Sequence, residues 1–149
     1  MFFAVELRAE YITLLTEAMK YELNINVPYV VIEGVSTNAF HSIKEEKSNL
    51  KTVLYSGGLS KEYGVLDLVY SFNRLKNNDY RLIICGSGDI EDEIKEICKK
   101  DNRIIFKGLI RREEVLKLQV SSSILVNPRS NNYSFTKFSF PSKIMEYMS

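Results

Sequence analysis

The residues best suited to do chemistry stand near the end of the chain. Pro141 and Ser142 precede a run of good helix formers, a pattern typical of a helix start with Ser142 or Ser139 as the N-cap. A helix start presents unpaired N–H groups and a partial positive charge, which can hold a phosphate. Lys143 adds a cation in that first turn, an unfavourable place unless an anion lies nearby. Glu146, one turn inside, can accept hydrogen bonds from a sugar hydroxyl.

Further candidates follow the ends of apolar runs that read as strands. Arg129 comes after one such run, and together with Lys143 it can hold a diphosphate and stabilise it as a leaving group. Gly57 and Gly58 open a loop before a helix, in which Lys61 is a flexible point charge within reach of a phosphate. A solvated surface lysine is the other interpretation of Lys61, and the pattern leaves both open.

A second glycine turn, Gly86-Ser87-Gly88, also joins a strand to a helix. It lacks the third glycine of the dinucleotide fingerprint, because Glu91 stands there and its charge repels a pyrophosphate. Two interpretations remain, a simple tight turn or a loop that lies near a ligand without gripping its phosphate.

The composition excludes several other classes of function. The formal net charge of +1 provides no field that would attract nucleic acid or a membrane. One histidine, His41, and two distant cysteines, Cys85 and Cys98, form no metal-ligand cluster and no Cys–His dyad, so we expect no metal. Two cysteines also suit a reducing cytoplasm. No apolar run approaches the roughly 20 residues of a membrane-spanning helix.

Short apolar runs and amphipathic segments alternate from residue 27 onward. They predict strands at 27–32, 51–56, 80–85, 103–106 and 124–126, and helices at 64–75, 89–100, 112–120 and from about 141. Such alternation implies right-handed crossovers and a mostly parallel sheet covered on both faces, that is, a doubly wound α/β fold. Ligands in such folds bind beyond the carboxyl ends of the strands, where the glycine loops and Arg129 stand.

The first 26 residues break this rhythm. They read either as a strand at 11–15 with a helix at 17–23 after Thr16, or as one helix over 5–23.

From Val53 to Met148 the chain resembles the C-terminal, Rossmann-like domain of GT-B glycosyltransferases of the retaining family 4 (group 1), especially bacterial enzymes of capsular and surface polysaccharides. The segments that carry the resemblance are 55–59, 63–65, 82–88, 105–108, 126–129 and 139–148. The resemblance implies binding of a nucleotide diphosphate sugar, without a cofactor or metal, for hexosyl transfer to a glycan or lipid-linked acceptor.

Site roles follow from the same resemblance. Glu146 matches the second glutamate of the family's E-x7-E motif, which binds the nucleotide ribose, whereas Phe138 stands in place of the first. Gly58 and Tyr63 occupy the positions of a basic pair that often binds the diphosphate, so other cations must substitute. The expected diphosphate-binding residues are Gly57, Gly58, Lys61, Arg129, Ser142 and Lys143, and the expected base-binding residues are Lys107, Gly108 and Leu109.

The resemblance also predicts the domain organisation. Residues 1–26 are expected to be a remnant of the N-terminal domain or a linker, and residues 27–149 a nucleotide-sugar-binding domain truncated at its C-terminus. Such a fragment is expected to be inactive alone. The enzyme is expected in the cytoplasm, with peripheral association at the inner face of the membrane through the missing domain left open. Two alternatives also stay open: a GT-B sugar-nucleotide epimerase, and a non-catalytic nucleotide-binding module, which Phe138 favours.

Overall fold

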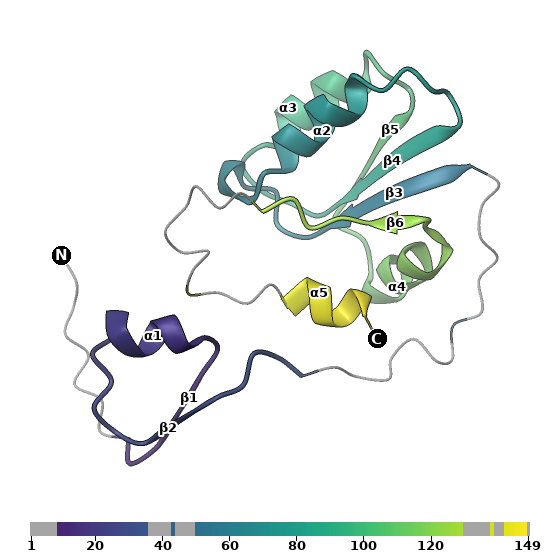
Figure 1. Cartoon of the computed structure of the whole chain (residues 1–149). Coiled ribbons are helices and arrows are strands. Elements are labelled where there is room, and N and C mark those ends of the chain that lie inside the picture. The colour runs from purple at the N-terminus through teal and green to yellow at the C-terminus, as the bar shows by residue number, and fades with distance from the viewer. Residues whose placement is uncertain (1–8, 36–42, 44–49, 130–137, 139–141, 149) are drawn as a thin grey trace.

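The structure is a computed structural model that describes residues 9–35, 43, 50–129, 138 and 142–148. The remaining residues include Ser139 and Pro141 of the expected helix start, so that part of the prediction lies outside the described residues. In chain order the elements are β1 (Ile12–Leu14), α1 (Glu17–Glu22), β2 (Tyr29–Val31), β3 (Lys51–Ser56), the 3₁₀ helix η1 (Lys61–Tyr63), α2 (Val65–Asn73), β4 (Tyr80–Cys85), α3 (Glu91–Cys98), β5 (Ile104–Gly108), α4 (Arg112–Ser121), β6 (Ile124–Leu125) and α5 (Ser142–Tyr147) (Figure 1).

The larger sheet has four strands in the order β5-β4-β3-β6, and every pair of neighbours is parallel. Helices α2 and α3 lie on one face of this sheet, and α4 and α5 lie on the other (Figure 1). The predicted doubly wound α/β fold is therefore confirmed.

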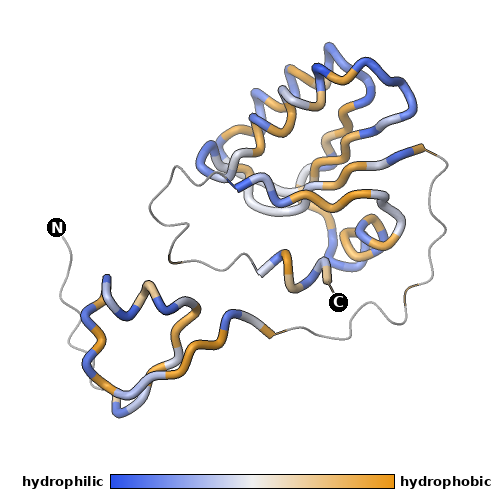
Figure 2. Tube along the Cα trace, viewed as in Figure 1, coloured by the Kyte–Doolittle hydropathy of each residue, from blue (hydrophilic) through white to orange (hydrophobic). Residues whose placement is uncertain are grey.

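The core lies between the sheet and the α2–α3 layer, and strand alternation decides which side chains reach it. Along β3, Val53 and Tyr55 point into this core, whereas Thr52, Leu54 and Ser56 stand at the alternate positions. The strands carry apolar residues and the helices alternate apolar with polar ones (Figure 2). The buried cluster comprises Val53, Tyr55, Leu59, Val65, Val69, Phe72, Leu82, Ile84, Ile90, Ile94 and Ile104.

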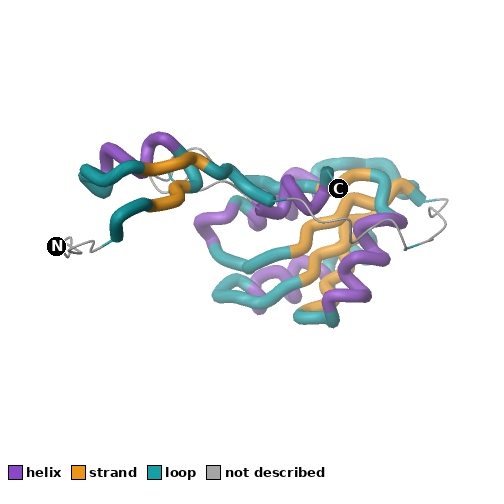
Figure 3. The backbone as a smooth tube through the Cα atoms, turned by 90° about the horizontal axis from the view of Figure 1, so that it is seen from below, coloured by secondary structure: helices purple, strands orange, loops and turns teal. Residues whose placement is uncertain are grey.

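The N-terminal segment forms a small unit of its own. Strands β1 and β2 pair in parallel in a separate two-stranded sheet, with α1 between them in the chain (Figure 3). The strand–helix interpretation of this region is therefore confirmed, and the single helix over 5–23 is wrong. The strand expected at 27–32 forms, but it pairs with β1 and not with β3. The expected domain boundary after residue 26 falls between these paired strands and stays a prediction.

Helices α2 and α3 are shorter than the pattern predicts at both ends, since α2 ends at Asn73 and α3 at Cys98, and turns precede their first residues. The 3₁₀ helix η1 and Gly64, in the left-handed region at φ 73°, precede α2. Before α3, the Ile90 N–H donates to the Leu59 carbonyl at 3.3 Å, which ties this turn to the preceding loop. Helix α3 therefore begins at Glu91 and not at 89.

Candidate active site

The two glycine turns lie against each other at the carboxyl ends of β3 and β4. The Gly57 N–H donates to the Cys85 carbonyl at 3.0 Å, and the Leu59 N–H donates to the Ser87 carbonyl at 2.9 Å. Gly86 has φ +140°, and a Cβ there would lie 1.8 Å from the Gly57 carbonyl oxygen. Only glycine permits this approach of two backbones. This approach explains the glycine at position 86, and because Gly86 and Ser87 also border a hollow, the tight turn and the loop near a ligand both stay open as interpretations.

Helix α5 reaches the same end of the sheet through a chain of polar side chains. Ser56, the last residue of β3, is buried, and its Oγ lies 3.4 Å from the Tyr147 hydroxyl of α5. Gln119 of α4, also buried, donates from Nε2 to Ser56 Oγ at 3.3 Å and to Glu146 Oε1 at 2.8 Å. Glu146 therefore stands beside the carboxyl end of the central strand β3, at the edge where the sequence placed it.

Lys143 and Glu146 form an ion pair within α5. Lys143 Nζ lies 3.2 Å from Glu146 Oε2, and the two side chains are 36% and 18% exposed. The carboxylate thus has one oxygen on the lysine and the other on Gln119. It is partly buried but still accessible to a ligand.

Two hollows open at this edge, and Gly57 and Gly58 line both of them. One, of about 230 Å³, is lined by Ser56, Gly57, Gly58, Cys85, Gly86, Ser87, Leu109, Ile110, Val115 and Lys143. The other, of about 260 Å³, is lined by Tyr55, Ser56, Gly57, Gly58, Tyr63, Asn127, Arg129, Lys143 and Tyr147. Lys143 therefore borders both hollows.

Aromatic side chains shape the second hollow. The Arg129 guanidinium lies over the Tyr63 ring, 5.2 Å from its centroid, and the Tyr55 hydroxyl donates to the Gly58 carbonyl at 2.6 Å. Burial, followed by the nearby Tyr147, raises the pKa of Tyr55 to about 12. The tyrosine therefore stays a neutral hydrogen-bond donor that holds the glycine loop.

The structure brings some of the sequence-predicted residues together and leaves others apart. Gly57, Gly58, Leu109, Arg129 and Lys143 line the hollows, and Glu146 adjoins them. The other predicted residues border neither hollow: Lys61, Lys107 and Ser142 are exposed, and Gly108, with φ +65°, accepts the Gly86 N–H at 2.8 Å.

Sequence reasoning missed Gln119, and it passed over Ser56 and Tyr147 as site residues. One signal for Gln119 was available. It stands three residues after Leu116, on the buried face of α4, where the helical period calls for an apolar side chain. A buried glutamine at such a position needs polar partners, and these were not visible in the pattern.

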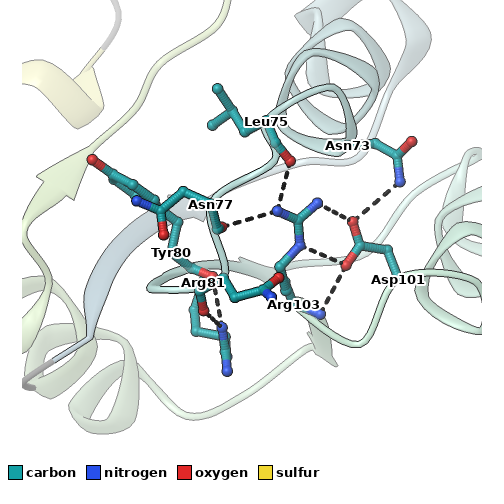
Figure 4. A network of polar contacts seen from close by, with 8 residues as sticks. Asn73, Leu75, Asn77, Tyr80, Arg81, Asp101 and Arg103 are labelled. Carbon is teal, nitrogen blue, oxygen red and sulfur yellow. Dashed lines mark hydrogen bonds and ion pairs between the residues drawn. The ribbon is translucent and has the colours of Figure 1, made fainter.

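A third hollow, of about 580 Å³, lies at the opposite end of the sheet beside Asp101 and Arg103. Both side chains are buried and paired with each other (Figure 4). Because their charges are already compensated, size alone does not make this hollow a site.

In the part of the chain that the structure describes, no group of three or more His, Cys, Asp and Glu side chains is placed to hold a metal ion. Among the same described residues, no helix has the length and apolarity needed to cross a membrane.

Comparison with known proteins identifies the family. The family model described as "Glycosyl transferases group 1" matches residues 36–149, most of the chain. The chain therefore belongs to the group 1 glycosyl transferases, as its motifs indicated. An uncharacterized glycosyltransferase of Methanocaldococcus jannaschii is 27% identical over 82 residues, which are 52% of this chain and 21% of that protein.

Solved glycosyltransferase structures share the fold. AviGT4, a glycosyltransferase involved in avilamycin A biosynthesis, superimposes with a TM-score of 0.60 at 16% identity, over 89% of this chain and 40% of that one. S. aureus TarM, crystallised with UDP, gives a TM-score of 0.55 at 17% identity, over 76% of this chain and 24% of that one. The chain thus spans less than half the length of each of these proteins.

Proposed function

We propose that this chain is the donor-binding part of a glycosyltransferase that uses a nucleotide diphosphate sugar, for retaining hexosyl transfer to a glycan or lipid-linked acceptor. One observation carries the proposal. Lys143 and Glu146 lie one turn apart on α5, beside Gly57 and Gly58 at the carboxyl end of β3. A cation, a carboxylate and exposed backbone therefore meet at the edge where α/β folds bind ligands.

In this proposal, Lys143 and Arg129 bind the diphosphate. Lys143 borders both hollows, and Arg129 borders the second, where the Tyr63 ring supports its guanidinium. The two replace the basic pair that often serves this role in the family. As the bond from the sugar to the diphosphate breaks, negative charge grows on the phosphate oxygens, and fixed cations stabilise it. Gly57 and Gly58 allow close approach of the phosphates to the backbone.

The carboxylate of Glu146 binds the ribose. Glu146 accepts hydrogen bonds from ribose hydroxyls, in exchange for part of its contact with Lys143. In this proposal the segment from Lys107 to Leu109 contacts the base, and Leu109, which borders the first hollow, lies nearest to it. Lys61 and Ser142 border neither hollow. Their contact with the diphosphate stays a prediction that mutation can test.

The similar folds support a nucleotide diphosphate as ligand. The TarM structure contains UDP, and the pneumococcal O-GlcNAc transferase GtfA, with a TM-score of 0.51 and 14% identity, contains UDP and GlcNAc. We therefore place the diphosphate of such a donor at the Lys143 edge.

Calorimetric titration tests the proposal. UDP, GDP, ADP and CDP are titrated into the chain beside the matching monophosphates. We expect one diphosphate to bind at least about tenfold more tightly than its monophosphate, because a second phosphate adds a charge-assisted contact. Arg129→Gln should reduce this ratio, whereas Lys99→Gln, at the other end of the sheet, should not. Equal affinity for diphosphate and monophosphate, or no binding of any nucleotide, refutes the proposal.

We also propose that the reaction takes place in the cytoplasm and needs no metal ion. The diphosphate charge is compensated by Lys143 and Arg129, so the dissociation constant should be the same with EDTA as with Mg²⁺. A much weaker affinity in EDTA would show that a divalent ion shares the diphosphate.

A further inference from the structure

We infer that Gln119 is a positioning residue that gives the site its preference for ribose over deoxyribose, by holding the Glu146 carboxylate in place. The inference rests on the proposed function, in which Glu146 binds the ribose of the donor. Gln119 itself has no assigned part in that function, and it is argued to act only through Glu146.

The contacts show how a single side chain links three elements. Gln119 Nε2 of α4 donates to Glu146 Oε1 of α5 at 2.8 Å and to Ser56 Oγ of β3 at 3.3 Å. Ser56 Oγ in turn lies 3.4 Å from the Tyr147 hydroxyl, next to Glu146 in α5. These hydrogen bonds hold the carboxylate in place relative to β3, the strand that leads into the glycine loop.

The side-chain amide of Gln119 is oriented with its NH₂ group toward Glu146 and Ser56, which leaves its oxygen unpaired. Gln119 is 3% exposed, and its Oε1 has no hydrogen-bond partner. Turning the amide over would bring that oxygen against the carboxylate of Glu146 and leave the NH₂ group without its two acceptors. A side chain that served only to fill space would be apolar here, since a buried unpaired oxygen is destabilising.

Lys143 cannot supply the same restraint. It lies on the same helix as Glu146, three residues earlier, so their ion pair leaves α5 free to shift relative to the sheet. A bound diphosphate also competes for the Lys143 ammonium. Once that contact is shared, the hydrogen bond from Gln119 is the contact among the described residues that still fixes the carboxylate. A fixed acceptor distinguishes a hydroxyl from a hydrogen, because an absent hydroxyl leaves it unpaired.

The test compares ligands that differ only in one hydroxyl. The nucleoside diphosphate that binds most tightly is titrated beside its 2′-deoxy and 3′-deoxy counterparts, into the chain and into Gln119→Leu. The unaltered chain should prefer the ribose form by about tenfold over at least one deoxy form, as expected for a hydrogen bond to a charged group. Gln119→Leu should lose most of this preference while binding the deoxy forms within about twofold of the unaltered chain.

Leu116→Ala is the matched control, because Leu116 is buried one turn earlier on the same helix and has no polar contact with Glu146. It should lower the thermal midpoint without changing the ribose preference. If Gln119→Leu does not fold, Gln119→Met, an unbranched side chain without hydrogen-bonding groups, replaces it. A ribose preference that survives in the folded variant overturns the inference, as does an equal loss for ribose and deoxyribose ligands. In either case the proposed function stands, whereas a chain that binds no nucleotide refutes both.

Discussion

Asp101 and Glu146 are partly or wholly buried carboxylates at opposite ends of the parallel sheet, and the two are held in different ways. At the amino ends of β4 and β5, the Asp101 carboxylate accepts hydrogen bonds from Arg103 Nε at 2.9 Å, Arg103 Nη2 at 2.7 Å and Asn73 Nδ2 at 3.1 Å. Arg103 Nη1 donates to the carbonyls of Leu75 and Asn77, at 2.6 and 3.0 Å (Figure 4). Every charge in this cluster is paired inside the protein.

At the carboxyl end of β3, the carboxylate of Glu146 has fewer partners within the protein. Glu146 has one hydrogen bond to each oxygen, from Gln119 and from Lys143, and the Gln119 carbonyl is left unpaired. The cluster of Asp101, Arg103 and Asn73 is closed, and it ties the end of α2 to the start of β5. The contacts of Glu146 with Gln119 and Lys143 form an open cluster, because the carboxylate can still accept hydrogen bonds. Comparable carboxylates are therefore fully paired at one end of the sheet and, at the other, carry the ribose-binding role that we propose for Glu146.

Breaking the closed cluster should produce the largest effect. Arg103→Leu leaves Asp101 buried without its cation and frees two backbone carbonyls. We expect the thermal midpoint to fall by roughly 10 °C, the range for removing one partner of a buried pair in a domain of this size. Below that midpoint, nucleotide affinity should be unchanged. Calorimetric melting with a parallel titration measures both, and Lys99→Gln, an exposed partner of Glu96, is the control. A variant that melts normally would contradict the structural role.

Acid should weaken the closed cluster next. Hydrogen bonds from Arg103 lower the pKa of Asp101 from 3.8 to about 2. Since the folded-state pKa lies below the unfolded one, the unfolded chain binds the proton first, and the stabilisation is present above about pH 4 and lost towards pH 2.

Thermal melts between pH 5 and pH 2 should therefore show a shallower acid dependence for Asp101→Asn than for the unaltered chain. Asp92→Asn, whose side chain is 99% exposed, should follow the unaltered chain. Parallel curves for the chain and Asp101→Asn would contradict the assignment of this acid sensitivity to Asp101.

Changes at the open end should affect binding and leave stability nearly intact. Lys143→Gln removes the ammonium that borders both hollows, and we expect about a tenfold loss of affinity for the preferred nucleoside diphosphate. Because Lys143 is partly exposed, its pair with Glu146 contributes little to folding, and the thermal midpoint should hardly move.

Lys61→Gln sharpens the same comparison. Lys61 is exposed and borders neither hollow, so its affinity change should stay within about twofold. A larger loss in Lys61→Gln than in Lys143→Gln would place the diphosphate elsewhere on the glycine loop.

The spacing of apolar residues along the chain predicted much of the fold. Alternating apolar runs predicted all four strands of the larger sheet, and the helix ends shifted where Gly64 and the Ile90–Leu59 hydrogen bond introduced turns. Strand pairing was less visible, since β2 reads as a strand equally well whether it joins β3 or β1. An extended segment reveals its period but not its neighbour.

The site shows the same division. The spacing of Lys143 and Glu146 is a property of one helix, so the sequence by itself determined that they are neighbours. It also determined the family and placed the glycine turns at the ends of strands. Only the tertiary structure decided that Gln119 meets Glu146, 27 positions away, and that Arg129 lies over Tyr63. Those contacts depend on how α4, α5 and the loops pack against the sheet, and packing between distant segments leaves no periodic signal in the chain.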